Sequence, residues 1–152
     1  MFGLQALSPK LFGGYNMMHK DPAEQSELEA CSGAYLMMRG DVVKKVGGFD
    51  PRFFMYAEDL DLCRKIREAG YKIWWYPKTS CVHFRGQSTK QTPQKMIYAF
   101  YEAMWLYYKK WYSRKYFYLM DPFVLIVLFG LYTMKSLRNM LKPKHKQFVS
   151  KS

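Results

Sequence analysis

An acidic cluster lies in residues 47–70, GGFDPRFFMYAEDLDLCRKIREAG, of a chain whose formal net charge is +12. Its carboxylates belong to Asp50, Glu58, Asp59, Asp61 and Glu68. Glu58 and Asp59 follow the aromatic, nearly uncharged stretch FDPRFFMYA, which would place the pair in the wall of a pocket. A carboxylate there could act as a general base, whereas the plainer reading is that the pair caps a helix and complements its dipole.

A second group of candidate residues lies at positions 83–88. His83 sits between apolar neighbours, where a lone histidine is more often a hydrogen-bonded core residue than a ligand. The loop after it carries Arg85, Gln87 and Ser88. Because imidazole binds metal ions and arginine pairs with phosphate oxygens, a metal and phosphate site is the competing hypothesis.

The triplet Asp59-Leu60-Asp61 matches a metal-binding Asp-x-Asp pattern by letter. Inside a helix, two residues at this spacing point away from each other, so we do not expect the two carboxylates to bind one ion. The sequence contains no phosphate-binding or dinucleotide-binding glycine motif, and no serine or cysteine in a nucleophile elbow.

The positions of these residues depend on elements that alternate between strand and helix, as in an α/β protein. Residues 1–30 contain breakers and predict an irregular lead-in. The next 54 residues predict, in order, a buried strand at Ala34–Met38, a short helix capped by Asp41 and ended by Gly47, a helix from Glu58 to Ala69 ended by Gly70, and strands in YKIWWYP and TSCVHF.

Two further helices are predicted in the C-terminal part. Thr92 and Pro93 occupy the preferred first positions of a helix that could run to about Tyr112. Asp121 and Pro122 repeat that signal for a helix that Pro143 would end.

The positive charge is concentrated in this C-terminal part. Residues 85–152 hold 13 Lys and Arg against 2 Asp and Glu, whereas residues 1–84 hold 11 against 10. Such asymmetry indicates a polyanionic partner, either nucleic acid or an anionic membrane surface. Aromatic residues and cations precede the apolar run at 123–134, which favours the membrane and disfavours nucleic acid.

The length of the apolar run indicates whether this helix would cross a membrane or lie in its interface. Twelve residues span about 18 Å as a helix, less than the roughly 30 Å hydrocarbon core, so the helix is expected to lie in the interface. A buried core helix is the alternative. The cysteines Cys31, Cys63 and Cys81 have no metal-type spacing and follow no recognisable secretory signal, which favours a reduced setting at the cytoplasmic face of the membrane.

Residues 31–88 together resemble the C-terminal half of the catalytic domain of family 2 inverting glycosyltransferases, especially the rhamnosyltransferase-like enzymes of bacterial surface polysaccharides. The resemblance rests on several motifs in the right succession: the turn Ser32-Gly33-Ala34, the GGFD loop at Gly47–Asp50, the aromatic run into Glu58-Asp59, and His83 after two short strands. It implies the acceptor-side portion of a GT-A, Rossmann-like α/β domain.

The resemblance also implies roles for individual residues. Asp59 is similar to the catalytic base that deprotonates the acceptor hydroxyl, with Glu58 as its supporting neighbour, and His83 to the histidine that helps hold the metal and diphosphate. Arg85, Gln87 and Ser88 resemble a loop that closes over the donor, whereas Ser32, Gly33, Ala34 and Asp61 fall on the acceptor side. A nucleotide-sugar donor, a divalent cation (Mg or Mn) and a glycan or lipid-linked acceptor follow as expected ligands.

One departure from the family is large. The family begins with a nucleotide-binding half that ends in an acidic metal motif, and nothing here corresponds to it, so the chain is expected to be truncated at its N-terminus and inactive alone. The expected organisation is a lead-in at 1–30, a partial catalytic domain at 31–91, and basic aromatic helices at 92–152. A membrane-bound interaction or scaffold protein derived from half an enzyme is the alternative function.

Overall fold

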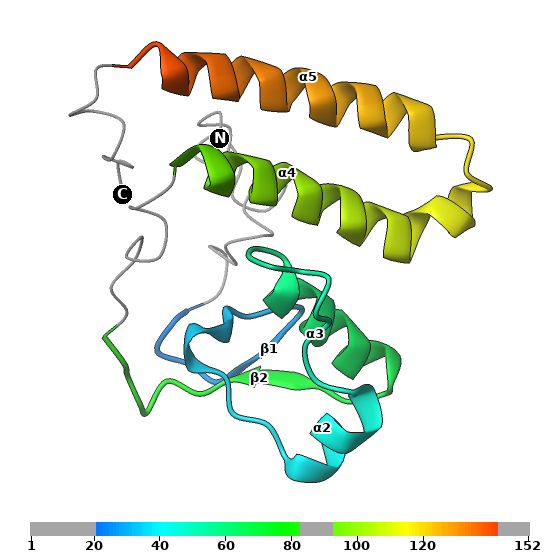
Figure 1. The fold of residues 1–152 in the computed structure, drawn as a ribbon. Coiled ribbons are helices and arrows are strands. Elements are labelled where there is room, and N and C mark those ends of the chain that lie inside the picture. Colours follow the sequence, from blue (N-terminus) through cyan, green and yellow to red (C-terminus); the bar gives the residue numbers. More distant parts are fainter. Residues whose placement is uncertain (1–20, 83–92, 143–152) are drawn as a thin grey trace.

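The computed structural model describes residues 21–82 and 93–142. Two short strands and four α-helices form the framework: β1 (Ser26–Leu28), α2 (Gly40–Val46), α3 (Glu58–Glu68), β2 (Ile73–Trp75), α4 (Pro93–Tyr108) and α5 (Asp121–Met140). In Figure 1, the strands, α2 and α3 form one layer, α4 lies beside it, and α5 lies on the far side of α4. Helix α4 therefore separates the layer that contains the sheet from the apolar helix α5.

A small core lies between the sheet and the first two helices. The strands β1 and β2 are antiparallel, with Leu28 opposite Ile73. The buried core consists of Val42, Leu62, Cys63, Ile66 and Ile73. Because α3 supplies three of these side chains from one face, burial of that face fixes how α3 is oriented.

The two predicted helices of this layer are confirmed. Gly47 adopts φ 79° and its N–H donates to the Val43 carbonyl, which ends α2 with a left-handed residue. Gly70, with φ 85°, follows the C-cap of α3 in the same way. Glycine is favoured at both positions because it has no Cβ to disfavour positive φ.

The strand predictions are partly wrong. Residues 26–28, placed in an irregular lead-in, form β1, and β1 occupies one edge of β2. The predicted strand at Ala34–Met38 begins instead with a 3₁₀ turn at Gly33–Tyr35 and continues as extended chain that pairs with no described residue. A strand needs a hydrogen-bonded neighbour as well as a suitable sequence, and only β1 and β2 satisfy that condition within the described residues.

Other boundaries also differ from the predictions. Asp41 lies inside the first turn of α2, where Arg39 is the N-cap and pairs with the Asp41 carboxylate at 2.9 Å. Residues 79–82 form no strand, and the rest of TSCVHF lies outside the described residues. The third helix leaves α-helical geometry after Tyr108 and continues as a π-helical segment, Lys109–Ser113. The fourth ends at Met140, before Pro143.

Helices α4 and α5 form an antiparallel hairpin (Figure 1). The Tyr132 ring of α5 meets the Tyr98 and Tyr101 rings of α4 edge to face, at centroid distances of 6.2 and 6.1 Å. Only Leu128 and Ser136 of α5 are buried. Most apolar side chains of α5 are therefore exposed: Phe123, Leu125, Ile126, Val127, Phe129, Leu131, Met134, Leu137 and Met140. Among the described helices, α5 is the one long and apolar enough to cross a membrane by length and composition.

A buried ion pair joins the hairpin to α3. Asp61 is fully buried, and its Oδ2 accepts from Lys110 Nζ at 2.8 Å while its Oδ1 accepts from Trp111 Nε1 at 2.8 Å. Lys110 Nζ also donates to Asp50 at 2.8 Å. Hydrogen bonds from Arg52 and then Lys110 hold the pKa of the Asp50 carboxyl well below its usual range. The Lys110 ammonium group thus links the π-helical segment to Asp61 of α3 and to Asp50 in the loop before α3.

The chain enters α3 through two left-handed residues. Tyr56 has φ 70° and Ala57, the N-cap of α3, has φ 59°. Apart from glycine, which has no Cβ, and to a lesser degree asparagine and aspartate, residues rarely adopt this conformation. The Tyr56 ring contacts the Phe100 ring of α4 edge to face at 5.4 Å, which is one contact that holds the bend in place. Strain of this kind collects at functional sites, and here it directly precedes Glu58 and Asp59.

The buried ion pair predicts that loss of Lys110 destabilises the protein more than loss of an exposed lysine. Replacement Lys110→Met leaves the Asp61 carboxylate buried with Trp111 as its remaining partner, and we expect a loss of about 3–5 kcal/mol in unfolding free energy. Lys115→Met, at an exposed lysine of the same region, should change it by less than about 0.5 kcal/mol. Urea denaturation measures both, and equal effects would show that the buried pair contributes nothing specific.

The left-handed N-cap predicts that glycine is tolerated at position 57 better than at the other end of α3. Ala57→Gly relieves roughly 1–2 kcal/mol of conformational strain against a glycine entropy cost of roughly 0.5–1 kcal/mol, so stability should stay level or rise. Ala69→Gly is the control, because Ala69 has φ −80° and gains no relief. Thermal unfolding should rank Ala57→Gly above Ala69→Gly, and the opposite order would refute the strain argument.

Candidate active site

Asp59 lies in the first turn of α3, with its side chain partly exposed. Its Oδ1 accepts from the Leu60 N–H at 2.8 Å, and its Oδ2 accepts from the Gly33 N–H at 3.2 Å. Each carboxylate oxygen retains a lone pair beyond these bonds. The helix start and the backbone donors thus orient a carboxylate that can still accept a proton from a ligand.

The turn Ser32-Gly33-Ala34 lies directly against this carboxylate. Ser32 Oγ accepts from the Ala34 N–H at 3.3 Å and so caps the 3₁₀ turn. A Cβ added to Gly33 would meet the Asp59 Cβ at 3.6 Å, which is ordinary contact distance. The structure therefore brings together two of the predicted motifs, and the backbone of Gly33 is the point of contact.

Glu58 contributes a buried oxygen atom. Its Oε2 is inaccessible to solvent and has no hydrogen-bond partner among the described residues. Buried polar atoms without partners are rare in native proteins, and each calls for an explanation such as a ligand or a catalytic role. Burial, and secondarily the negative charge of Glu58, raise the pKa of the Tyr56 hydroxyl.

Asp61 lies elsewhere. The family resemblance implies an acceptor-side position for Asp61, but its two carboxylate oxygens accept hydrogen bonds from Lys110 and Trp111 inside the protein. The carboxylates of Asp59 and Asp61 therefore bind different groups, as expected for this spacing on a helix. Sequence reasoning missed Lys110 and Trp111 as partners, since 49 and 50 residues separate them from Asp61.

A thiol pair lies behind the site, and sequence reasoning missed it as well. Cys31 precedes the Ser32 turn and Cys63 lies one helical turn after Asp59, with the two Sγ atoms 3.8 Å apart. The Cys31 N–H donates to Cys63 Sγ at 3.4 Å. The hydrogen bond with Cys31 lowers the pKa of the Cys63 thiol to about 7, and the same bond, with burial, raises the pKa of Cys31. This contact helps hold the turn against α3.

His83, Arg85, Gln87 and Ser88 lie outside the described residues. Within residues 21–82 and 93–142, no three His, Cys, Asp or Glu side chains form a group that could hold a metal ion. The described residues therefore do not form a divalent-cation centre by themselves.

Comparison with known proteins identifies the family. The N-acetylglucosaminyl-diphospho-decaprenol L-rhamnosyltransferase of Mycobacterium tuberculosis is 30% identical over 93 residues, which is 61% of this chain and 30% of that protein. Rhamnosyltransferase WbbL of Escherichia coli K12 is 35% identical over 54 residues, 36% of this chain and 20% of that protein. The succinoglycan biosynthesis protein ExoA of Rhizobium meliloti is 40% identical over 52 residues, 34% of this chain and 16% of that protein.

These matches cover a third or less of each curated relative. No solved structure matches the chain. The family described as glycosyl transferase family group 2 matches residues 15–143, which is most of the sequence. The acidic helix start and the turn packed against it both fall within that match, and the chain belongs to glycosyl transferase family group 2.

Proposed function

We propose that this chain supplies the acceptor side of a GT-A glycosyltransferase, which transfers a sugar with inversion from a nucleotide-sugar donor. The observation that carries the proposal is the 3.2 Å hydrogen bond from the Gly33 N–H to Asp59 Oδ2, which joins two motifs 26 residues apart. Two of the relatives are rhamnosyltransferases by name and a third is named for succinoglycan biosynthesis. A glycan or lipid-linked saccharide is accordingly the acceptor class.

Asp59 acts as the general base in this proposal. The acceptor hydroxyl donates its proton to the free lone pair of an Asp59 oxygen while the hydroxyl oxygen bonds to the anomeric carbon of the donor sugar. The bond from that carbon to the diphosphate oxygen breaks, and the nucleoside diphosphate leaves. The fixed Gly33 and Leu60 donors keep the carboxylate in one orientation, which is the condition for efficient proton transfer.

Neighbouring residues position the acceptor and the base. Ser32 and Ala34 flank the Gly33 contact, so an acceptor that reaches Asp59 passes this turn. Glu58 supports Asp59 from the adjacent helical position, with its Oε2 buried and unpartnered among the described residues. Asp61 acts as a positioning residue, because its bonds to Lys110 and Trp111 fix the helix that carries Asp59.

The donor side requires residues beyond those described. Arg85, Gln87 and Ser88 are proposed to close over the donor diphosphate, with His83 as a ligand of a divalent cation, Mg or Mn. A base without a positioned donor lacks the proximity and electrostatic terms that supply most of the rate acceleration. The chain by itself is therefore proposed to be inactive until a donor-binding half completes the site.

The hairpin is proposed to attach the protein to the cytoplasmic face of the membrane. The whole of α5 measures about 30 Å, longer than its uninterrupted apolar run, so length alone does not prevent a crossing. Two features favour a helix lying in the interface: α4 packs along α5, and α5 itself contains Lys135 and Arg138. Exposed Arg114, Lys115 and Lys142 add attraction to anionic lipid.

The exposed apolar face of α5 also favours a second candidate function. A membrane-bound interaction protein would use that face without any glycosyl transfer. Activity of the completed enzyme separates the two functions.

The base role predicts a selective defect. In a complex of this chain with a donor-binding half, Asp59→Asn should lower glycosyl transfer by about 10²-fold or more and change the Kd of the nucleotide sugar by less than about twofold. Transfer of radiolabelled sugar and titration calorimetry measure the two quantities. Asp41→Asn, at an exposed carboxylate of α2, is the control. Parallel loss of binding and transfer would assign Asp59 a structural role instead.

The membrane proposal predicts that a charge on the outer face of α5 weakens lipid binding. Ile126 is 70% exposed on α5, and Val82, which lies outside the α4–α5 hairpin, is 83% exposed. With phosphatidylserine-containing vesicles, wild-type protein and Val82→Glu should float, whereas Ile126→Glu should bind about tenfold more weakly because a carboxylate resists burial among acyl chains. Flotation of Ile126→Glu at the wild-type level, or no flotation of the wild type, would contradict the proposal.

A further inference from the structure

The GGFD loop at Gly47–Asp50 leaves one aromatic ring exposed beside the proposed base. Phe49 is 51% exposed, whereas Phe53, four residues later, is buried. A Cβ added to Gly33 would lie 3.9 Å from Phe49 Cζ and 3.6 Å from Asp59 Cβ. The tip of the Phe49 ring and the side chain of the base therefore border the same turn.

The loop backbone is held on both sides of this ring. Gly48 has φ 63°, and its carbonyl accepts a hydrogen bond from Lys65 Nζ of α3. On the other side, Asp50 Oδ2 accepts from Lys110 Nζ at 2.8 Å. These two cations fix the residues before and after Phe49, so the loop keeps its place while the ring stays outside the core.

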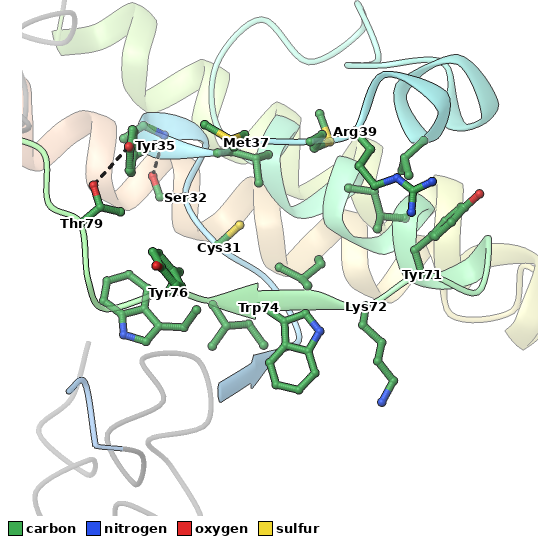
Figure 2. A pocket seen from close by; sticks show the side chains of 18 of the residues that line it. Cys31, Ser32, Tyr35, Met37, Arg39, Tyr71, Lys72, Trp74, Tyr76 and Thr79 are labelled. Atoms are coloured by element: carbon green, nitrogen blue, oxygen red, sulfur yellow. Dashed lines mark hydrogen bonds between the residues drawn. The ribbon is translucent and has the colours of Figure 1, made fainter. Parts of the chain in front are cut away.

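The turn beside the ring is fixed as well. Ser32 Oγ caps it, and the Tyr35 hydroxyl at its end lies 3.4 Å from Thr79 Oγ1 (Figure 2). The Gly33 N–H orients the Asp59 carboxylate. A single exposed aromatic residue is common on protein surfaces. Phe49 differs because its ring and the base are held against one preorganised turn, which lowers the cost of ordering a bound ligand.

We propose that Phe49 positions the acceptor by stacking on the C–H face of its terminal pyranose ring, so that a hydroxyl of that sugar reaches Asp59. The inference rests on the proposed function and names the residue that binds the acceptor sugar. A pyranose carries C–H groups on its faces and hydroxyls around its rim. The face of an aromatic ring is negative, so it attracts the slightly positive hydrogens of those C–H groups.

The surroundings of the ring favour a sugar over a purely apolar ligand. A ligand that covers Phe49 also meets the Asp59 carboxylate and the exposed backbone of Gly33, since all three border one turn. An acyl chain has no hydrogen to donate to the carboxylate, whereas a sugar supplies hydroxyl donors next to its C–H face. Phe49 is accordingly a positioning residue, and the proton passes to Asp59.

The test pairs a truncation with a rescue. Phe49→Ala removes the ring, and Phe49→Trp keeps an aromatic face. Phe54→Ala is the matched control, because Phe54 is 60% exposed and its ring lies next to Lys95 of α4, whose Nζ is 4.6 Å from the ring centroid. The probes are the methyl glycosides of glucose, galactose and N-acetylglucosamine. Saturation-transfer NMR measures their binding to the full chain, and acceptor kinetics are measured in the complex with a donor-binding half.

We expect at least one glycoside to bind the full chain, with saturation transfer strongest at the protons of one ring face. Phe49→Ala should weaken this binding about fivefold or more, and Phe49→Trp and Phe54→Ala should stay within about twofold of wild type. In the complex, Phe49→Ala should raise the acceptor KM by a similar factor and leave kcat within about twofold, because stacking is equal in the ground state and the transition state.

The melting temperature of Phe49→Ala should match that of Phe54→Ala, because both rings are at least half exposed. If Phe49→Ala does not fold, nuclear Overhauser contacts between the glycoside C–H protons and the Phe49 ring of the wild-type chain decide.

Several results would overturn the proposal. These are failure of all three glycosides to bind, normal binding by Phe49→Ala, and equal effects of Phe49→Ala and Phe54→Ala. Weaker association of Phe49→Ala with the donor-binding half, with sugar binding intact, would show instead that this half covers the ring. Sugar binding is read without transfer and Asp59→Asn should retain it, so binding that depends on Phe49 without any transfer would count against the proposed function alone.

Discussion

The arrangement of the described chain depends on the buried ion pair between Asp61 and Lys110. A carboxylate with no solvent exposure is stable only when charged or polar donors replace water, and Lys110 and Trp111 supply two such donors from a single π-helical segment. Lys110 also binds Asp50 in the glycine loop, so one cation holds the loop, α3 and the hairpin in a common arrangement. Arg64 of α3 adds to the same junction, since its guanidinium lies over the Trp111 and Tyr112 rings, 4.7 and 4.8 Å from their centroids.

This junction places the structural carboxylate of Asp61 and the proposed base Asp59 on one short helix. Asp59 and Asp61 are two residues apart, which turns their side chains to different sides of α3. One side faces the Gly33 turn and accepts backbone donors, and the other faces the hairpin and accepts side-chain donors. A movement of the hairpin that displaces Asp61 would therefore also displace α3, the helix that carries Asp59.

Local signals in the sequence predicted the four helices and the strand β2, but they did not predict which segment pairs with β2. Gly47, Gly70 and Pro93 mark helix ends that depend on backbone conformation within one turn, and the structure has those ends. The strand predicted at Ala34–Met38 and the strand missed at Ser26–Leu28 both depend on which segment lies alongside, which no local pattern encodes. The family resemblance singled out Gly33 and Asp59 separately, but neither their contact nor the Asp61–Lys110 pair was predicted, because each joins residues far apart in the chain.

The π-helical segment Lys109–Ser113 has a consequence for how this region can vary in length. A π turn contains one residue more than an α turn. This extra residue determines how the side chains before and after it are rotated about the helix axis. Deleting one residue would restore regular α-helix and rotate the flanking side chains by about 100° relative to each other. Lys110 and Trp111 could then no longer both face α3. Among homologous sequences, this segment should therefore tolerate substitutions at its exposed positions while keeping its length, so that alignment gaps fall outside residues 109–113.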